Sequence, residues 1–173
     1  MRFYLRRVLL QNFIYSIKEL IYSVFFLMSS INNHWKLIKT VLPQFTDHAG
    51  VMWHGSYLNF LEECRLDALD KVGISYSELS KKGFEIPVIS IQLRYKKSFI
   101  HGEKVLLKSQ FKLENKIRLI CKTLFLKSNG DIGAEAKVEL VVVRKINDSI
   151  KVVKELPAKI KNIFLMLEEG PKV

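Results

Sequence analysis

The sequence predicts an α+β fold in which one five-stranded antiparallel sheet wraps around a long central helix. One observation behind this prediction is a single amphipathic segment long enough for about five helical turns. The other is a set of five segments that are rich in β-forming residues and separated by turn sequences. The chain has 173 residues, of which 49% are apolar. That composition is sufficient for one domain with a buried core.

The first predicted elements are a strand and the long helix. Residues 34–45 are rich in β-forming residues and alternate through Trp35, Leu37 and Lys39, which predicts a strand that ends at Pro43. Residues 55–72 carry apolar side chains at spacings of three and four, and Gly73 follows as a stop signal. A short second helix is predicted over residues 75–82.

Four further strands complete the predicted sheet. Turn signals separate them at Gly102, at Glu114-Asn115 and at Asn129-Gly130, and the last of these is typical of a tight hairpin. Short turns between successive strands favour antiparallel pairing. The predicted strands are residues 85–96, 103–113, 116–127 and 132–145.

Composition divides the chain into a leader at 1–33, a folded domain at 34–145 and a tail at 146–173 with a short helix around 160–167. The leader is apolar and basic, but it lacks the roughly 18 uninterrupted apolar residues of a membrane span. Two interpretations of residues 1–27 are an interfacial helix that lies on a membrane surface and a helix that packs on the domain. The third interpretation is that translation starts at Met28, so that these residues are absent from the native protein.

The formal net charge of +11 predicts an anionic partner, which is nucleic acid, a membrane surface or a phosphorylated small molecule. We find no aromatic RNA-binding motif and no basic recognition helix, which argues against nucleic acid. Basic residues concentrate in one region, and many of them are expected to lie on one solvent-facing side of the sheet: Arg94, Lys96, Lys97, Lys104, Lys108, Lys112, Lys116, Arg118 and Lys122.

Cys64 and Cys121 have no metal-ligand spacing, so we expect buried, reduced thiols in a protein of the cytoplasm. The histidines likewise show no spacing typical of metal ligands. The sequence therefore predicts no metal site.

The segment DHAGVMWHGSY, residues 47–57, holds the most concentrated set of reactive side chains. Asp47 lies in a loop before the helix, where a carboxylate can act as a nucleophile or as a general base. Gly50 permits a tight backbone path, and the N-terminus of the helix favours a polarised oxygen. The structural alternative is that Asp47 and His54 only cap or brace the loop.

The longer segment FTDHAGVMWHGSYLNFLEECR resembles the signature of the 4-hydroxybenzoyl-CoA thioesterase family of hotdog-fold acyl-CoA thioesterases. The resemblance extends over residues 35–144 and implies the α+β hotdog fold. It implies hydrolysis of an acyl or aroyl thioester without a cofactor, on coenzyme A or an acyl carrier protein. It also implies a homodimer or homotetramer whose active sites are shared between chains.

The resemblance assigns roles to individual residues. It implies that Asp47 is the catalytic carboxylate and that the backbone N–H at His54 polarises the carbonyl, with the His54 side chain close by. Gly50, Trp53 and Tyr57 are the implied substrate-binding positions. Trp53 replaces a common tyrosine, which is expected to alter the acyl pocket.

Some relatives of this kind place their working carboxylate on the helix, so Glu62 is a secondary catalytic candidate. Its ordinary role would be an ion pair with Arg65, three residues further along the helix. Two other functions stay open at the level of sequence. One is a non-hydrolytic hotdog protein, either an acyl-binding module or a dehydratase. The other is a basic protein that binds nucleic acid or a membrane surface.

Overall fold

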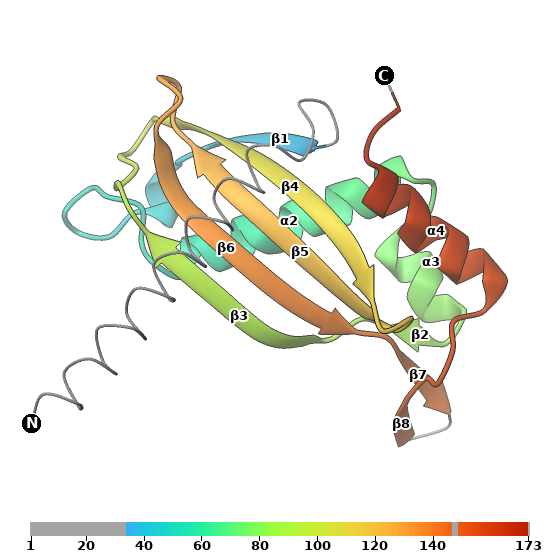
Figure 1. Ribbon diagram of the computed structural model, residues 1–173. Helices are drawn as coiled ribbons and strands as arrows, with labels where there is room; N and C mark the ends of the chain where they lie inside the picture. The colour runs from blue at the N-terminus through green and yellow to red at the C-terminus, as the bar shows by residue number, and fades with distance from the viewer. Residues whose placement is uncertain (1–33, 147–148, 173) are drawn as a thin grey trace, which may run out of the picture. The chain divides into compact units, whose positions relative to one another are not determined.

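The computed structural model describes residues 34–146 and 149–172. Within these residues, a five-stranded antiparallel sheet curves around the helix α2 (Ser56–Lys71), as the sequence predicts (Figure 1). The predicted leader at 1–33, including residues 1–27 and Met28, lies outside the described residues. None of the described helices is long and apolar enough to span a membrane.

The strand order of the large sheet is β1-β4-β5-β6-β3, and all neighbouring strands are antiparallel. Consecutive strands β4, β5 and β6 are joined by the short turns that the sequence indicates. The strands β1 and β3 lie at the two edges of the sheet. The strands are β1 (Trp35–Thr40), β3 (Val88–Tyr95), β4 (Lys104–Glu114), β5 (Arg118–Leu126) and β6 (Ile132–Val141).

The predicted strand 132–145 is one element in the sequence analysis and two in the structure. Val142 is fully buried and separates β6 from β7 (Val143–Ile146), and its N–H donates to the carbonyl of Ile117. The chain then leaves the large sheet. β7 pairs with β2 (Phe84–Glu85) and with β8 (Ser149–Val152) in a second sheet of three strands.

The predicted helices are confirmed with small changes in their bounds. The buried residues of α2 recur at helical spacing and face the sheet: Tyr57, Phe60, Leu61, Cys64, Ala68 and Leu69. In α3 (Tyr76–Lys81), Ser75 and Glu78 form a capping box. The predicted first strand ends early, because Pro43 begins a short 3-10 turn, η1 (Pro43–Phe45).

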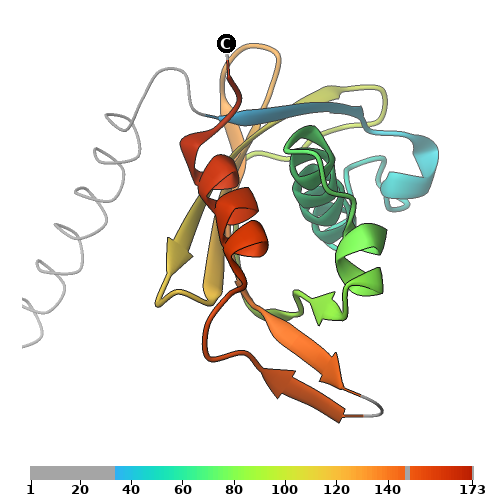
Figure 2. The ribbon, with the colours of Figure 1, turned by 90° about the vertical axis from the view of Figure 1, so that its right-hand side faces the viewer.

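The last helix, α4 (Ala158–Glu169), begins before the predicted residue 160 and belongs to the core. Its Ile160, Phe164 and Leu167 pack with the same apolar cluster as α2. The Trp35 indole donates to the Leu167 carbonyl at 2.8 Å. Figure 2 shows α4 beside α2 on the concave side of the large sheet.

A small polar cluster lies inside this core. The Ser109 hydroxyl lies 2.9 Å from the Thr123 hydroxyl and donates to the Cys64 sulfur at 3.3 Å. Cys64 and Cys121 are both buried free thiols, as the sequence predicts. Because each hydroxyl has a partner, the cluster adds polar groups to the core without leaving them unsatisfied.

Candidate active site

The loop that carries Asp47 is held in shape by backbone hydrogen bonds. The Asp47 N–H donates to the Val51 carbonyl at 2.9 Å, and the Gly50 N–H donates to the Asp47 carbonyl at 3.0 Å. Gly50 has a φ of +74°, a left-handed conformation that favours glycine. Asp47 is a partly buried residue, and its Oδ1 accepts the Ala49 N–H at 2.8 Å. These contacts fix the carboxylate relative to the backbone.

Two further contacts attach this loop to neighbouring segments. The Met52 N–H donates to the Phe99 carbonyl at 2.7 Å, and the Trp53 N–H donates to the Phe45 carbonyl at 2.9 Å. The buried Ser56 hydroxyl also donates to the Phe45 carbonyl, at 3.0 Å. The reactive loop is therefore hydrogen-bonded into a corner between η1, α2 and the segment after β3.

The N-terminus of α2 follows directly. Its N-cap residue is Gly55, no side chain caps it, and its first turn contains no acidic residue. The partial positive charge of the helix end is therefore not offset by a protein carboxylate in the first turn. A polarised carbonyl oxygen or an anionic group can be stabilised here.

Trp53 and His54 cover this helix end on the solvent side. Trp53 is 47% exposed, and its ring lies 4.9 Å from the ring of His54. The Trp53 ring also lies so close to Gly55 that a Cβ at this position would collide with it. A glycine is needed here because it lets the indole lie flat against the start of the helix.

Tyr95, at the end of β3, belongs to the same region although the sequence analysis did not select it. Its hydroxyl donates to the His54 carbonyl at 3.2 Å, and its ring packs edge-on against Tyr57 at 5.0 Å. Tyr95 is far from His54 in the sequence and follows an ordinary strand pattern. Only the pairing of the strands reveals that it reaches the reactive loop.

Tyr57 lies on the inner side of the site. It is 3% exposed and packs against Phe99 and Phe125 as well as Tyr95. Burial, with a smaller effect of the neighbouring Tyr95, raises the pKa of Tyr57 to about 12, while a backbone hydrogen bond with Phe99 opposes the shift. Tyr57 therefore forms the floor of the site as a neutral phenol.

This raised pKa predicts a pH dependence of stability. The neutral form of Tyr57 is favoured in the folded protein, so its contribution is complete below pH 10 and is lost as the pH rises toward 12. We expect wild-type protein to lose on the order of 2 kcal/mol more than Tyr57→Phe over this interval. Urea unfolding at several alkaline pH values measures the difference. Parallel curves for the two proteins would contradict it.

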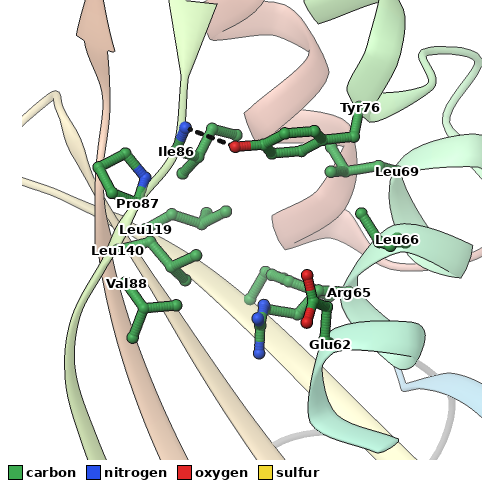
Figure 3. Close-up of a pocket in the computed structure, with 11 residues that line it drawn as sticks. Glu62, Arg65, Leu66, Leu69, Tyr76, Ile86, Pro87, Val88, Leu119 and Leu140 are labelled. Carbon is green, nitrogen blue, oxygen red and sulfur yellow. Dashed lines mark hydrogen bonds between the residues drawn. The ribbon is translucent and has the colours of Figure 1, made fainter. Parts of the chain in front are cut away.

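Glu62 is placed elsewhere, two helical turns beyond His54 or about 12 Å along the helix axis. It lines an apolar cavity of about 290 Å³ between α2, α3 and the sheet (Figure 3). The Arg65 guanidinium, also at this cavity, donates to the Leu61 carbonyl at 3.0 Å. Two other acids of α2 form ion pairs: the Glu63 carboxylate meets Lys39 at 2.5 Å, and the Asp67 carboxylate meets Lys71 at 2.6 Å. The other cavity residues are mostly apolar: Leu66, Leu69, Tyr76, Ile86, Pro87, Val88, Phe111, Leu119 and Leu140.

The reactive loop and the cavity lie at opposite ends of the edge strand β3. Tyr95 contacts His54 at one end, and Val88 lines the cavity at the other. The structure thus brings together Asp47, the Gly50 turn and the start of α2, and it separates them from Glu62. No cluster of side chains that could hold a metal ion is found within 34–146 and 149–172.

A curved antiparallel sheet around one long helix is the hotdog architecture of thioesterase-like proteins. The sequence matches the Thioesterase-like superfamily over residues 41–164, and the chain belongs to that superfamily. The resemblance and the hotdog fold predicted from the sequence are thereby confirmed.

Individual relatives agree with this assignment. The chain is 28% identical over 144 residues to a putative esterase of Synechocystis sp., covering 82% of this chain and 86% of the relative. It is 27% identical over 100 residues to the putative acyl-CoA thioesterase YneP of Bacillus subtilis, covering 58% and 72% of the two chains. The crystal structure of a DHNA-CoA thioesterase from Staphylococcus aureus is similar in fold, with a TM-score of 0.69 and 24% identity. That similarity covers 76% of this chain and 89% of the other.

Proposed function

We propose that the protein is an acyl-CoA thioesterase that hydrolyses an acyl or aroyl thioester to the free acid and the thiol. The observation that carries the proposal is the Asp47 carboxylate, fixed by the Ala49 N–H in the loop that leads to the start of α2. Membership of the superfamily and the similarity to YneP support it.

In the proposed reaction, the thioester carbonyl oxygen accepts a hydrogen bond from the backbone N–H at His54, at the positive end of α2. Asp47 then acts in one of two ways. It attacks the carbonyl carbon, which expels the thiolate and leaves an anhydride that water hydrolyses, or it takes a proton from a water molecule that attacks instead. In both routes the carbon–sulfur bond breaks, and the thiolate is released or protonated. Neither route needs a cofactor or a metal.

We also propose that two subunits pair through β3. One edge of β3 pairs with β6, and no strand of the described part of the chain pairs with its other edge. This edge carries apolar side chains that are unusually exposed, including Ile89 at 48%, Ile91 at 42% and Tyr95 at 54%. An exposed apolar edge strand is a surface that proteins normally cover. A second copy can cover it by antiparallel pairing around a twofold axis.

Such pairing would connect the two features at the ends of β3. An antiparallel neighbour places the Tyr95 end of one strand beside the Val88 end of the other. The reactive loop of one subunit would then face the apolar cavity of its partner, so the acyl group would enter that cavity. A volume of about 290 Å³ lies near the lower limit for ligand sites and favours medium-chain or single-ring acyl groups over long chains.

A thiol-release assay on the full chain tests the proposed function. The substrates are acyl-CoA thioesters of increasing chain length, one aroyl-CoA, and the same acyl groups on an acyl carrier protein. We expect thiol release with an optimum at medium-chain or single-ring acyl groups and without added metal. Calorimetric binding of acyl-CoA with no thiol release on any substrate would instead indicate an acyl-binding protein.

A further inference from the structure

The outer face of the large sheet, opposite α2, is strongly basic. Side chains alternate along each strand, and Ser109, which contacts Cys64 of α2, marks the inner face of β4. The neighbours of Ser109 in the strand therefore point outward. The cations of the outer face come from all five strands: Lys36, Arg94, Lys104, Lys108, Lys112, Arg118, Lys122 and Lys137. The acids on the same face are fewer: Glu114, Glu135 and Glu139.

Several of these cations lie directly opposite one another. Lys36 of β1 is paired with Lys108 of β4, and Lys122 of β5 is paired with Lys137 of β6. Like charges opposite one another in a sheet are destabilising. Some of the charge is offset, since Lys137 meets Glu139 at 2.6 Å and Lys112 meets Glu114 at 3.5 Å.

The positive charges on this face also affect the pKa values of two neighbouring groups. Burial, together with the charges of Lys137 and Lys112, lowers the pKa of Lys122. Burial and the charges of Lys108 and Lys36 lower the pKa of His34. The positive potential of this face is therefore felt across the strands that form it, and an anion bound there would relieve it.

An apolar strip adjoins the cations on the same face. Ile38, which is 64% exposed, lies opposite Leu106, and Leu106 lies opposite Leu126. The helices α2 and α4 pack on the inner face, where α4 contacts Trp35 and Leu113, so neither of these two helices covers the strip. The outer face thus combines a cationic region with the exposed Ile38 and the partly exposed Leu106 and Leu126.

Charge and composition decide between the occupants of this face. A second copy of the chain would bring two cationic faces together, which is repulsive. The outward positions of β1, β4 and β5 contain no aromatic residue on which bases could stack, which argues against single-stranded nucleic acid. Anionic lipid headgroups neutralise lysines, and the headgroup boundary accepts aliphatic side chains.

We propose that the outer face of the large sheet docks on an anionic membrane surface. Lys36, Lys104 and Lys108 contact headgroup phosphates and carboxylates, and Ile38 reaches the boundary of the acyl chains. The reactive loop and the cavity lie on the opposite, inner side of the sheet, so docking leaves them accessible. This binding does not depend on the chemistry at Asp47.

Sedimentation with lipid vesicles tests the proposal on the full chain. We expect the wild type to bind phosphatidylcholine vesicles that contain phosphatidylserine, to bind pure phosphatidylcholine weakly, and to dissociate as salt is raised. The variant Lys36→Gln/Lys104→Gln/Lys108→Gln is expected to bind roughly 100-fold more weakly, since each surface lysine contributes about fivefold. Its melting temperature should equal or exceed that of the wild type, because repulsion between the lysines is removed.

The matched control is Lys81→Gln/Lys159→Gln/Lys161→Gln, which removes the same charge from exposed positions of α3 and α4. It is expected to bind like the wild type. An equal loss in the control would show a general charge effect and overturn the proposal. Wild-type affinity in the outer-face variant would also overturn it and would assign the binding to residues 1–27. Binding to heparin but not to vesicles would identify a soluble polyanion as the partner, against the proposal.

Discussion

Replacing Asp47 by asparagine is expected to lower kcat by roughly 10³-fold or more, with little change in melting temperature. Asparagine keeps the oxygen that accepts the Ala49 N–H, so the loop should keep its shape. It lacks the negative charge that a nucleophile or a general base requires. Steady-state thiol release and thermal unfolding of the same preparations measure the two effects.

The control for this variant is Asp70→Asn, which removes an exposed carboxylate near the other end of α2. Its activity should equal that of the wild type. If folded Asp47→Asn protein retains full activity, the catalytic role passes to Glu62 or Glu63 on the helix. Glu62→Gln, at the mouth of the cavity, then becomes the decisive variant.

The second large effect is expected from Ile91→Asp in the middle of β3. We expect wild-type protein to sediment as a dimer, or as a tetramer made of two such dimers, at micromolar concentration and the variant to sediment as a monomer. A charge at this edge would lie in the proposed interface without its water shell. The activity of the monomeric variant should be lower than that of the wild type, because the reactive loop would lose the cavity of its partner. The isolated subunit should stay folded, since Ile91 is already 42% exposed.

Leu165→Asp is the matched control, because Leu165 has a similar exposure of 39% but lies on α4. It should leave both assembly and activity unchanged. An active wild-type monomer in the centrifuge would rule out a shared active site. In that case the cavity and the loop of one subunit would have to act without a partner.

The parts of the fold that could be predicted from the sequence are those specified by local signals. The apolar spacing of α2, with Gly73 after it, locates the helix to within one residue at each end. The Asn129-Gly130 turn locates the β5–β6 hairpin. The reactive segment is contiguous from Asp47 to Tyr57, so its residues could be selected together before their positions were known.

The other features depend on contacts between distant segments. The break at Val142 lies where the chain passes from the large sheet to the second sheet, and no break is marked in the local sequence. Tyr95 joins the site only because β3 pairs with β6 and ends beside α2. The cavity is formed by residues from several elements. The basic residues were expected on one side of the sheet, but only the strand register shows that this side is opposite α2.

The positions of the two tryptophans make intrinsic fluorescence a probe of two separate parts of the molecule. The sequence has two tryptophans, and they lie in opposite environments: Trp35 is 6% exposed with its indole N–H bonded to Leu167, whereas Trp53 is 47% exposed against Gly55. Emission from Trp35 reports on the packing of α4. Emission from Trp53 reports on whatever approaches the start of α2. In Trp35→Phe protein, Trp53 is the remaining tryptophan. Quenching of its emission in a stopped-flow experiment would measure the rate of thioester binding, before any bond is broken.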